Sequence, residues 1–307
     1  MDKVYDLVII GSGPSGLTAA IYAKRAGLDF LILKDKYSLD SQIVNTYEID
    51  NYTGIQKTTG QDLYDKMKQH AMSLGIEITE EKAIDIKNET KDLKQVVTKN
   101  NIYNTKTIII ATGAIPKKLG CKGESEYQGM GVSYCATCDG AFYKDKTCIV
   151  VGGGNVAVED AIFLTRICKK VYLLVRKNYM RADKILQDEL LSKNNVEVLF
   201  NTELQEIKAK DFVDSVVIFN NLSNTMININ TDAVFVAIGV EPITSILKDK
   251  VNMKDNYIVA DESCASSISG IYACGDVRYK QLRQVITAAA DGANAISSIQ
   301  KYLIKNK

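Results

Sequence analysis

Apolar residues occur along the chain in short runs that stop at glycine, threonine or charged residues. The runs lie at residues 4–10, 28–33, 107–111, 147–151, 171–175 and 233–240. Uninterrupted apolar runs of this length predict strands that are buried on both faces, as in a parallel sheet. Two other stretches, 17–26 and 59–74, are helical in pattern. This alternation of strands and helices predicts an α/β protein.

Two further features complete the predicted pattern of elements. Short β-like segments between about 76 and 105 predict a meander, and the stretch from about 281 to 303 predicts a closing helix.

A glycine-rich loop follows the first apolar run and opens the first helical stretch. Its residues are Gly11, Ser12, Gly13, Pro14, Ser15 and Gly16. In a dinucleotide-binding fold, the first glycine forms the turn, the second lets backbone approach a pyrophosphate, and the third allows close helix packing. The N–H groups at the start of the helix then face the phosphates. The loop therefore predicts a first dinucleotide site.

An acidic residue follows the next predicted strand. Asp35 lies 22 residues after Gly13, about where a carboxylate meets a ribose hydroxyl in such folds. The alternative is that Asp35 is a solvated turn residue.

A second glycine loop, at residues 152–157, follows the run 147–151 and opens another helix. The strand after it ends in Arg176 and Lys177, and Arg181 lies four residues beyond Lys177. Basic side chains at this position neutralise a 2′-phosphate, whereas an acidic residue favours a free 2′-hydroxyl. This pattern favours NADPH over NADH. The alternative is that these residues form a solvated turn.

The two halves of this pattern follow one plan. Each has a glycine loop near its start and an apolar run ending in glycine near its end, at Gly113 and Gly239. Pro116 and Pro242 follow these glycines, and proline resists both helices and central strands. We therefore expect two Rossmann-like dinucleotide-binding domains, with the second, residues 117–243, inserted into the first, residues 1–116 and 244–307.

The composition narrows the possible function. Among 307 residues, 46% are hydrophobic, and 38 Lys and Arg balance 37 Asp and Glu. A net charge near zero favours neither nucleic acid nor an anionic membrane as a partner. The apolar runs are too short to span a bilayer, and no signal peptide is expected. His70 is the only histidine, which excludes a histidine triad or a histidine-based metal cluster.

Two of the seven cysteines form a close pair, Cys135 and Cys138. Thiols separated by two residues can close and reopen a small disulfide. An odd cysteine count with one close pair favours a catalytic dithiol in a reducing cytoplasm over a secreted disulfide framework. The other five are expected to be small buried hydrophobic residues.

The order and content of these motifs resemble the low-molecular-weight, FAD-containing thioredoxin reductases of the prokaryotic type, over essentially the whole chain. The segments that carry the resemblance are residues 11–16, 51–54, 131–140, 152–155, 181–186, 275–276 and 283–285.

The resemblance implies a homodimer with FAD in the outer domain, and with NADPH and the dithiol in the inserted domain. The implied FAD contacts are Gly11, Ser12, Gly13, Pro14, Ser15, Gly16, Asp35, Gln42, Asn51, Ala111, Thr112, Gly113, Gly275, Asp276, Arg283, Gln284 and Val285. The implied NADPH contacts are Gly152, Gly154, Asn155, Ala157, Arg176, Lys177 and Arg181.

The resemblance also assigns roles at the cysteine pair. Cys138 corresponds to the thiol that faces the flavin, Cys135 to the thiol that attacks the thioredoxin disulfide, and Asp139 to the acid and base. It further implies that the inserted domain rotates about the crossings near Pro116 and Pro242. The chain departs from the family at Thr53, where proline is usual, at Val175, where histidine is usual, and at Met130, where a basic residue is common.

Two alternatives remain. One is a flavin-containing thioredoxin reductase that takes its electrons from ferredoxin and has lost the nicotinamide site. The other is a nucleotide-binding module without catalytic activity, in which Cys135 and Cys138 form half of a structural zinc site.

Overall fold

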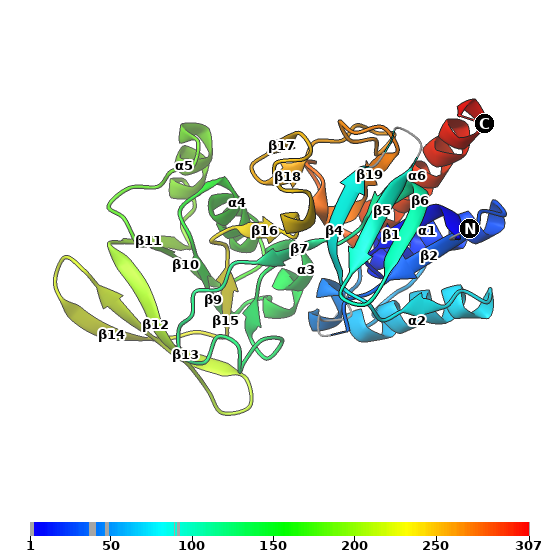
Figure 1. Cartoon of the computed structure of the whole chain (residues 1–307). Coiled ribbons are helices and arrows are strands. Elements are labelled where there is room, and N and C mark those ends of the chain that lie inside the picture. Colours follow the sequence, from blue (N-terminus) through cyan, green and yellow to red (C-terminus); the bar gives the residue numbers. More distant parts are fainter. Residues whose placement is uncertain (1–2, 37–40, 47–48, 89, 91–92, 307) are drawn as a thin grey trace. The chain divides into compact units, whose positions relative to one another are not determined.

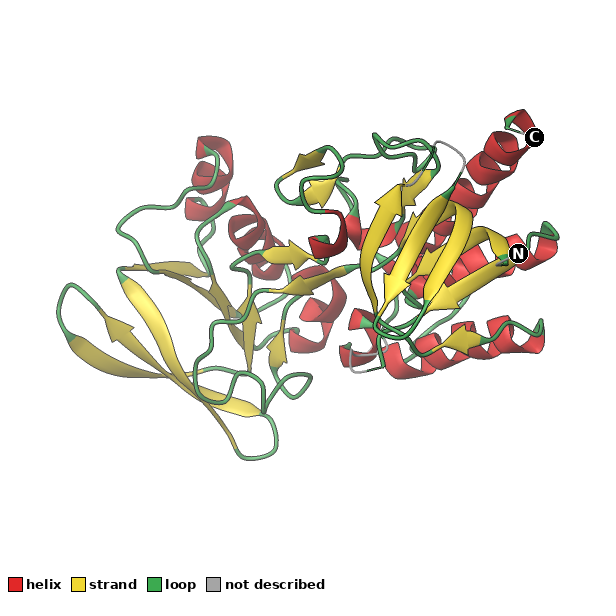
Figure 2. Cartoon of the chain, in the orientation of Figure 1, coloured by secondary structure: helices red, strands yellow, loops and turns green. Residues whose placement is uncertain are grey.

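A computed structural model describes residues 3–36, 41–46, 49–88, 90 and 93–306. The chain divides into two compact units (Figure 1). Unit 1 consists of Met1–Val44, Tyr52–Ile115 and Glu241–Lys307, and unit 2 of Asn45–Asn51 and Pro116–Val240. Both units mix helices and strands (Figure 2), which confirms the predicted α/β class.

Unit 1 is built on a seven-stranded sheet in the order β3-β2-β1-β6-β5-β4, with β19 also paired to β6. The bounds of these strands are β1 Val4–Ile10, β2 Phe30–Leu33, β3 Ile78–Thr79, β4 Ala83–Asn88, β5 Lys94–Thr98, β6 Ile102–Ile110 and β19 Ile271–Ala273. The pairs that involve β1, β2, β3 and β19 are parallel, whereas β4, β5 and the start of β6 form an antiparallel meander. The parallel strands are apolar and buried where they cross the core, at residues 7–10 of β1 and 108–110 of β6, as burial on both faces requires.

Helices pack beside this sheet, and two of them pack tightly on each other. The helices of unit 1 are α1 Pro14–Arg25, α2 Gly60–Ser73 and α6 Val285–Lys305. A Cβ atom added at Gly292 of α6 would lie 2.3 Å from the carbonyl oxygen of Ser15 in α1, so only glycine permits this approach. Helix α1 follows the first glycine loop directly, so its contact with α6 fixes the position of that loop.

Unit 2 is built on a five-stranded parallel sheet in the order β11-β10-β9-β15-β8. The bounds of the strands are β8 Val132–Ser133, β9 Thr147–Val151, β10 Lys170–Val175, β11 Val196–Phe200 and β15 Ala233–Val236. Three helices belong to this unit, α3 Ala136–Asp139, α4 Asn155–Thr165 and α5 Lys184–Leu191. A separate antiparallel sheet consists of β12 Thr202–Ala209, β13 Val213–Asn220 and β14 Thr225–Asn230.

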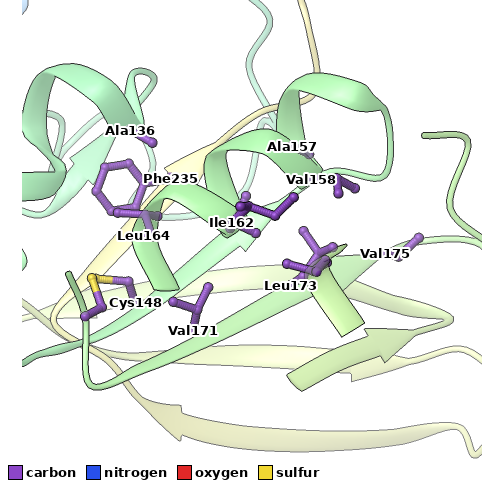
Figure 3. Close-up of a cluster of buried hydrophobic side chains, with 14 of the residues drawn as sticks. Ala136, Cys148, Ala157, Val158, Ile162, Leu164, Val171, Leu173, Val175 and Phe235 are labelled. Atoms are coloured by element: carbon purple, nitrogen blue, oxygen red, sulfur yellow. The ribbon is translucent and has the colours of Figure 1, made fainter. Parts of the chain in front are cut away.

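The two faces of the five-stranded sheet are covered by different layers. On one face, Ala157 and Leu164 of α4 pack with Cys148 of β9 and Phe235 of β15 (Figure 3). On the other face, Ile149 of β9 belongs to a cluster with side chains of β12 and β13. Because alternate residues of a strand face opposite sides, burial on both faces explains the uninterrupted apolar sequence.

Short elements complete the described structure. They are β7 Ala114–Pro116, β16 Val240–Pro242, β17 Met253–Lys254, β18 Tyr257–Ile258 and the 3₁₀ turns η1 Gln42–Asn45, η2 Gly140–Tyr143, η3 Ser245–Leu247 and η4 Gly275–Val277. Two of the points where the chain changes unit lie within β7 and β16, which pair with each other, and the other two lie at the ends of the segment Asn45–Asn51. The helices of the described residues are all too short or too polar to span a bilayer.

Some predicted elements differ from the structure. The apolar run 233–240 does not form one strand, because Gly239 adopts a φ of +113° and separates β15 from β16. The predicted meander ends in the first residues of β6, which begins at Ile102 and continues through the buried run 107–110 as one strand. The unit boundaries lie at 115/116 and 240/241, and residues 45–51, expected in the first domain, group with unit 2. The described part of that segment contributes no strand to the first sheet.

The α1–α6 approach leads to a prediction. We expect Gly292→Ala to lower the free energy of unfolding by about 1–3 kcal/mol, because the added methyl group must displace the backbone of α1. Chemical denaturation measures this value. Ser297→Ala, at an exposed position of the same helix, is the control and should change it little. An unchanged stability for Gly292→Ala would contradict the close helix packing.

Candidate active site

The cysteine pair lies at the start of α3, directly after β8. Cys135 is the residue before the helix, and its carbonyl oxygen accepts hydrogen bonds from the N–H groups of Cys138 (3.2 Å) and Asp139 (3.1 Å). The two cysteines are joined in a disulfide with a Cα–Cα distance of 5.3 Å, and both residues are partly exposed. The predicted pairing is confirmed, so these sulfurs are not two free ligands for zinc.

Asp139 stands behind the disulfide with its carboxyl group mostly buried. Burial raises the pKa of Asp139 to about 6, while a hydrogen bond from Ser133 opposes this rise. The hydroxyl of Ser133 donates to Oδ2 of Asp139 at 2.5 Å, whereas the buried Oδ1 has no partner among the described residues. A carboxyl group whose pKa lies near the working pH can both give and accept a proton.

Tyr134, between Ser133 and Cys135, is anchored by a buried carboxylate. Its hydroxyl donates to Oε1 of Glu124 at 2.9 Å, and the backbone N–H groups of Leu119 and Gly120 donate to the same carboxylate. Burial and the neighbouring Glu124 raise the pKa of Tyr134, which keeps the phenol protonated as a donor. The sequence contains no motif that marks Glu124, whose contribution is visible only in the fold.

The second glycine loop lies at the same edge of the sheet as the disulfide. Strands β8 and β9 both run parallel to β15, so the residues that follow their carboxyl ends are on one side of unit 2. Gly152 has no space for a side chain, because its Cβ would lie 2.4 Å from the carbonyl oxygen of Ala237. At Gly154 a Cβ would have no atom within 4 Å. The loop is thus packed at its first glycine and open at its third, before the start of α4.

The basic side chains predicted for NADPH are exposed near this loop. The N–H of Arg181 donates to the carbonyl oxygen of Gly153 at 2.6 Å, which places Arg181 beside the loop. Arg176 is exposed as well, and the ammonium of Lys177 lies 3.0 Å from the hydroxyl of Tyr179. This hydrogen bond and the positive charge of Lys177 lower the pKa of Tyr179.

A pair of reciprocal hydrogen bonds holds the second loop to the basic segment. The amide of Asn155 donates to the carboxylate of Asp183, and the N–H of Asp183 donates back to the amide oxygen of Asn155, both at 2.9 Å. Ala157 is fully buried beneath the loop in the core of unit 2. Asp183 was not predicted as a site residue, although it stands in the segment that carries the resemblance.

The first glycine loop is shaped by the same constraints. A Cβ at Gly11 would lie 2.2 Å from the carbonyl oxygen of Ala111, and one at Gly16 would lie 1.9 Å from that of Gly11. Gly13 is more open, with the hydroxyl of Ser41 at 3.4 Å as the nearest atom. The hydroxyl of Ser12 is buried and has no partner among the described residues. An unpaired buried hydroxyl is costly unless a ligand completes its hydrogen bonding.

A second group of buried polar atoms that lack hydrogen-bond partners among the described residues lies around η4. Oδ1 of Asp276 and Nε of Arg283 are buried without a hydrogen-bond partner among the described residues. Burial raises the pKa of Asp276, and the guanidinium of Arg283 stacks 4.0 Å from the centre of the Tyr257 ring. Together with Ser12, these atoms offer donors and acceptors to a polar ligand. The residues present therefore fit FAD, which has phosphate, ribose and ring groups to complete these hydrogen bonds.

A buried ionic cluster around Asp291 holds the backbone at the start of η4. Asp291 of α6 accepts from the N–H of Gly275 at 2.9 Å, from the guanidinium of Arg278 at 3.0 Å and from the ammonium of Lys280 at 3.0 Å. The side chains of Arg278 and Asp291 are 6% and 5% exposed, so the charges are shielded from water. Asp291 was not predicted, because its partners are 11 to 16 residues away in sequence and no motif connects them.

The remaining predicted flavin contacts occupy several places. Pro14 and Ser15 begin α1, Gln284 and Val285 begin α6, and Thr112 and Gly113 hydrogen bond with Ile243. Gln42 is exposed in η1, and Asn51 lies in the segment that groups with unit 2. The carboxylate of Asp35 pairs with Lys82 at 3.0 Å.

The residues outside these loops have ordinary surroundings. His70 is exposed on α2, and Cys148, Cys168, Cys264 and Cys274 are buried, while Cys121 is partly buried. Within the described ranges, no group of three or more His, Cys, Asp or Glu side chains is arranged to hold a metal ion.

Comparisons with known proteins agree with this geometry. The family model "Pyridine nucleotide-disulphide oxidoreductase" matches residues 5–292. The chain is 41% identical over 98% of both chains to the "34.2 kDa protein in rubredoxin operon" of Clostridium pasteurianum. It is 41% identical to the thioredoxin reductase of Listeria innocua, over 98% of this chain and 95% of that one. The crystal structure of thioredoxin reductase from Streptococcus pyogenes has a TM-score of 0.94 at 40% identity, covering 99% of this chain and all of that one.

The buried ionic cluster leads to a prediction. We expect Asp291→Asn to lower the free energy of unfolding by about 3 kcal/mol, because Arg278 and Lys280 lose their buried counter-charge. The Gly275 turn also loses a strong acceptor, so the purified variant should retain less FAD, measured by flavin absorbance against protein absorbance. Asp211→Asn, at an exposed carboxylate of unit 2, is the control. Full flavin content at wild-type stability would rule out this role for Asp291.

Proposed function

The chain belongs to the pyridine nucleotide-disulphide oxidoreductase family, within its thioredoxin reductases, and we propose that the Cys135–Cys138 disulfide carries electrons from NADPH to thioredoxin. The resemblance inferred from the sequence is confirmed by these matches. The observation that carries the proposal is the partly exposed disulfide with a buried carboxyl group, at the sheet edge that also bears a dinucleotide loop.

The cofactors of this enzyme are FAD and NADPH. The chemistry that FAD supplies when bound is two-electron transfer between a nicotinamide and a disulfide. We assign the flavin to unit 1, where Ser12, Asp276 and Arg283 have buried atoms without a hydrogen-bond partner among the described residues, and NADPH to the Gly152–Ala157 loop of unit 2. In terms of the domains expected from the sequence, these are residues 1–116 with 244–307, and residues 117–243.

The cysteine pair exchanges with thioredoxin in two steps. The thiolate of Cys135 attacks one sulfur of the thioredoxin disulfide, forms a mixed disulfide and releases the first thioredoxin thiolate. The thiolate of Cys138 then attacks the sulfur of Cys135, which re-forms the Cys135–Cys138 disulfide and releases the second thioredoxin thiolate. The two protons lost by the cysteines are taken up by the two thioredoxin thiolates, and Asp139 is placed to move them.

The proposal includes a rotation of the inserted domain. We place the hinges of this rotation at β7 and β16, which pair with each other. We further propose a homodimer, by analogy with the family, and a cytoplasmic location, which the five free cysteines support.

The donor is NADPH and not ferredoxin in this proposal. The open Gly154, the buried Ala157 and the exposed Arg176 and Arg181 preserve what a phosphorylated dinucleotide requires. A reductase that had lost the nicotinamide site would not need a basic cluster beside a glycine loop.

Two cysteine variants test the exchange. We expect Cys135→Ser and Cys138→Ser each to reduce NADPH-dependent thioredoxin turnover by at least about 10³-fold, because either change removes the disulfide that must form. The assay follows NADPH oxidation with oxidised thioredoxin, and Cys121→Ser, at a partly buried free cysteine, is the control. Full turnover by either variant would exclude the proposed thiol exchange.

The role of the basic cluster is tested by comparing the KM for NADPH with the KM for NADH. We expect the double substitution Arg176→Ala with Arg181→Ala to raise the KM for NADPH about tenfold or more, because each side chain neutralises the 2′-phosphate. The KM for NADH, which lacks this phosphate, should change little. Lys169→Ala, at an exposed position away from the loop, is the control. An unchanged preference for NADPH over NADH would show that the phosphate is recognised elsewhere.

A further inference from the structure

Ser133, the last residue of β8, connects the cysteine pair to the buried carboxyl group. Ser133 is buried, with only 6% of its surface exposed. The hydroxyl accepts a hydrogen bond from the N–H of Cys135 at 3.1 Å and donates to Oδ2 of Asp139 at 2.5 Å. The carbonyl oxygen of Cys135 lies farther away, at 3.4 Å. A hydroxyl has a single proton to donate, so the short contact with the carboxylate is the one that uses it.

Asp139 depends on this one hydrogen bond. Its second oxygen, Oδ1, is buried and has no partner among the described residues. Burial disfavours the ionised carboxyl group, and the hydrogen bond from Ser133 favours it. Ser133 therefore acts on both the orientation of the carboxyl group and the balance between its two protonation states.

The other groups that face Asp139 do not replace this contact. A cavity of about 120 Å³ borders Asp139 and Ser133, and its lining includes Phe142, Tyr143 and Lys146. Lys146 is the charged neighbour in this lining, and its ammonium stands 5.7 Å from the centre of the Tyr143 ring. Cys135 and Cys138 lie within four residues of Asp139 along the chain, and their sulfurs become thiols on reduction.

We propose that Ser133 is a positioning residue for thiol exchange: its hydroxyl holds the carboxyl group of Asp139 against the Cys135 backbone, so that a proton can pass between Asp139 and the cysteine thiols. This inference rests on the proposed function, because it assigns Ser133 to the proton transfer of that reaction. The proton that leaves a cysteine on oxidation goes to Asp139 and then to a thioredoxin thiolate. Ser133 itself keeps its proton throughout.

The test measures the protonation of Asp139 through its effect on the neighbouring thiols. The full-length protein with its flavin is reduced with dithiothreitol and freed of reductant without oxygen. Iodoacetamide alkylation of the peptide that contains Cys135 and Cys138 is then followed by mass spectrometry between pH 5 and pH 9. Only thiolates react, and a negative Asp139 disfavours a thiolate beside it. The rate profile of the wild type should therefore contain an inflection near the pKa of Asp139.

We expect Ser133→Ala to move this inflection to higher pH by about one unit, because the ionised carboxyl group loses its hydrogen-bond donor. Ser133→Thr keeps a hydroxyl on a strand that tolerates β-branched residues, so it should restore the wild-type profile. Asp139→Asn should abolish the inflection. Ser215→Ala is the matched control, because Ser215 also donates to an aspartate, Asp214, at 2.6 Å, but in β13.

The proposal is overturned if Ser133→Ala shows the wild-type inflection, or if Asp139→Asn retains it. Should Ser133→Ala fail to fold, Ser133→Gly removes the same hydroxyl and must show the same shift. The measurement requires neither NADPH nor thioredoxin. A shifted inflection in Ser133→Ala, together with a wild-type protein that does not reduce thioredoxin, would thus refute the proposed function alone. Normal wild-type turnover without a shift in Ser133→Ala would refute the role of Ser133 alone.

Discussion

The geometry of the site in unit 2 depends on the parallel direction of its five central strands. Because β8, β9 and β15 run the same way, the segments that follow β8 and β9 emerge at one edge of the sheet. The disulfide follows β8, and the glycine loop follows β9. An antiparallel arrangement of these strands would place the loop and the disulfide at opposite edges, and one unit could then not present both to a flavin.

Burial of polar groups is the second constraint, and the two units use it differently. In unit 2, Glu124 accepts from two backbone N–H groups and from Tyr134, whereas one oxygen of Asp139 has no hydrogen-bond partner in the described part of the chain. A satisfied carboxylate is structural, and a half-satisfied one is available for proton transfer. In unit 1, Asp291 accepts hydrogen bonds from Gly275, Arg278 and Lys280, while Oδ1 of Asp276 has no hydrogen bond among the described residues and lies 3.8 Å from the ammonium of Lys280.

Much of the fold could be predicted from the sequence, because its constraints are local. Strands buried on both faces need uninterrupted apolar runs, and Gly11, Gly16 and Gly152 stand where a Cβ would collide with backbone. The pairing of Cys135 with Cys138 also follows from their spacing. Helix ends and short strands were less predictable, since Gly239 could not be distinguished from a strand glycine until its φ of +113° was known.

The residues that support the site could not be predicted, because their roles depend on partners distant in sequence. Asp291 is an unremarkable acidic residue of an amphipathic helix until Arg278 and Lys280 fold against it. Ser133 is a strand residue whose hydroxyl can be assigned a role only once the fold places Asp139 within hydrogen-bonding distance. Likewise, Lys82 forms an ion pair with the carboxylate of Asp35, the residue that the sequence predicts to contact a ribose. Hydrogen bonds of this kind carry no periodicity that a sequence pattern can reveal.

The most direct measurement of the central claim is a count of thiols in the purified flavin-containing protein before and after anaerobic addition of NADPH. The account predicts that NADPH opens one disulfide, so that two further thiols, located by mass spectrometry to Cys135 and Cys138, become open to alkylation. If NADPH is added and the Cys135–Cys138 disulfide stays closed in the presence of bound flavin, the proposed path of electrons through this pair is contradicted.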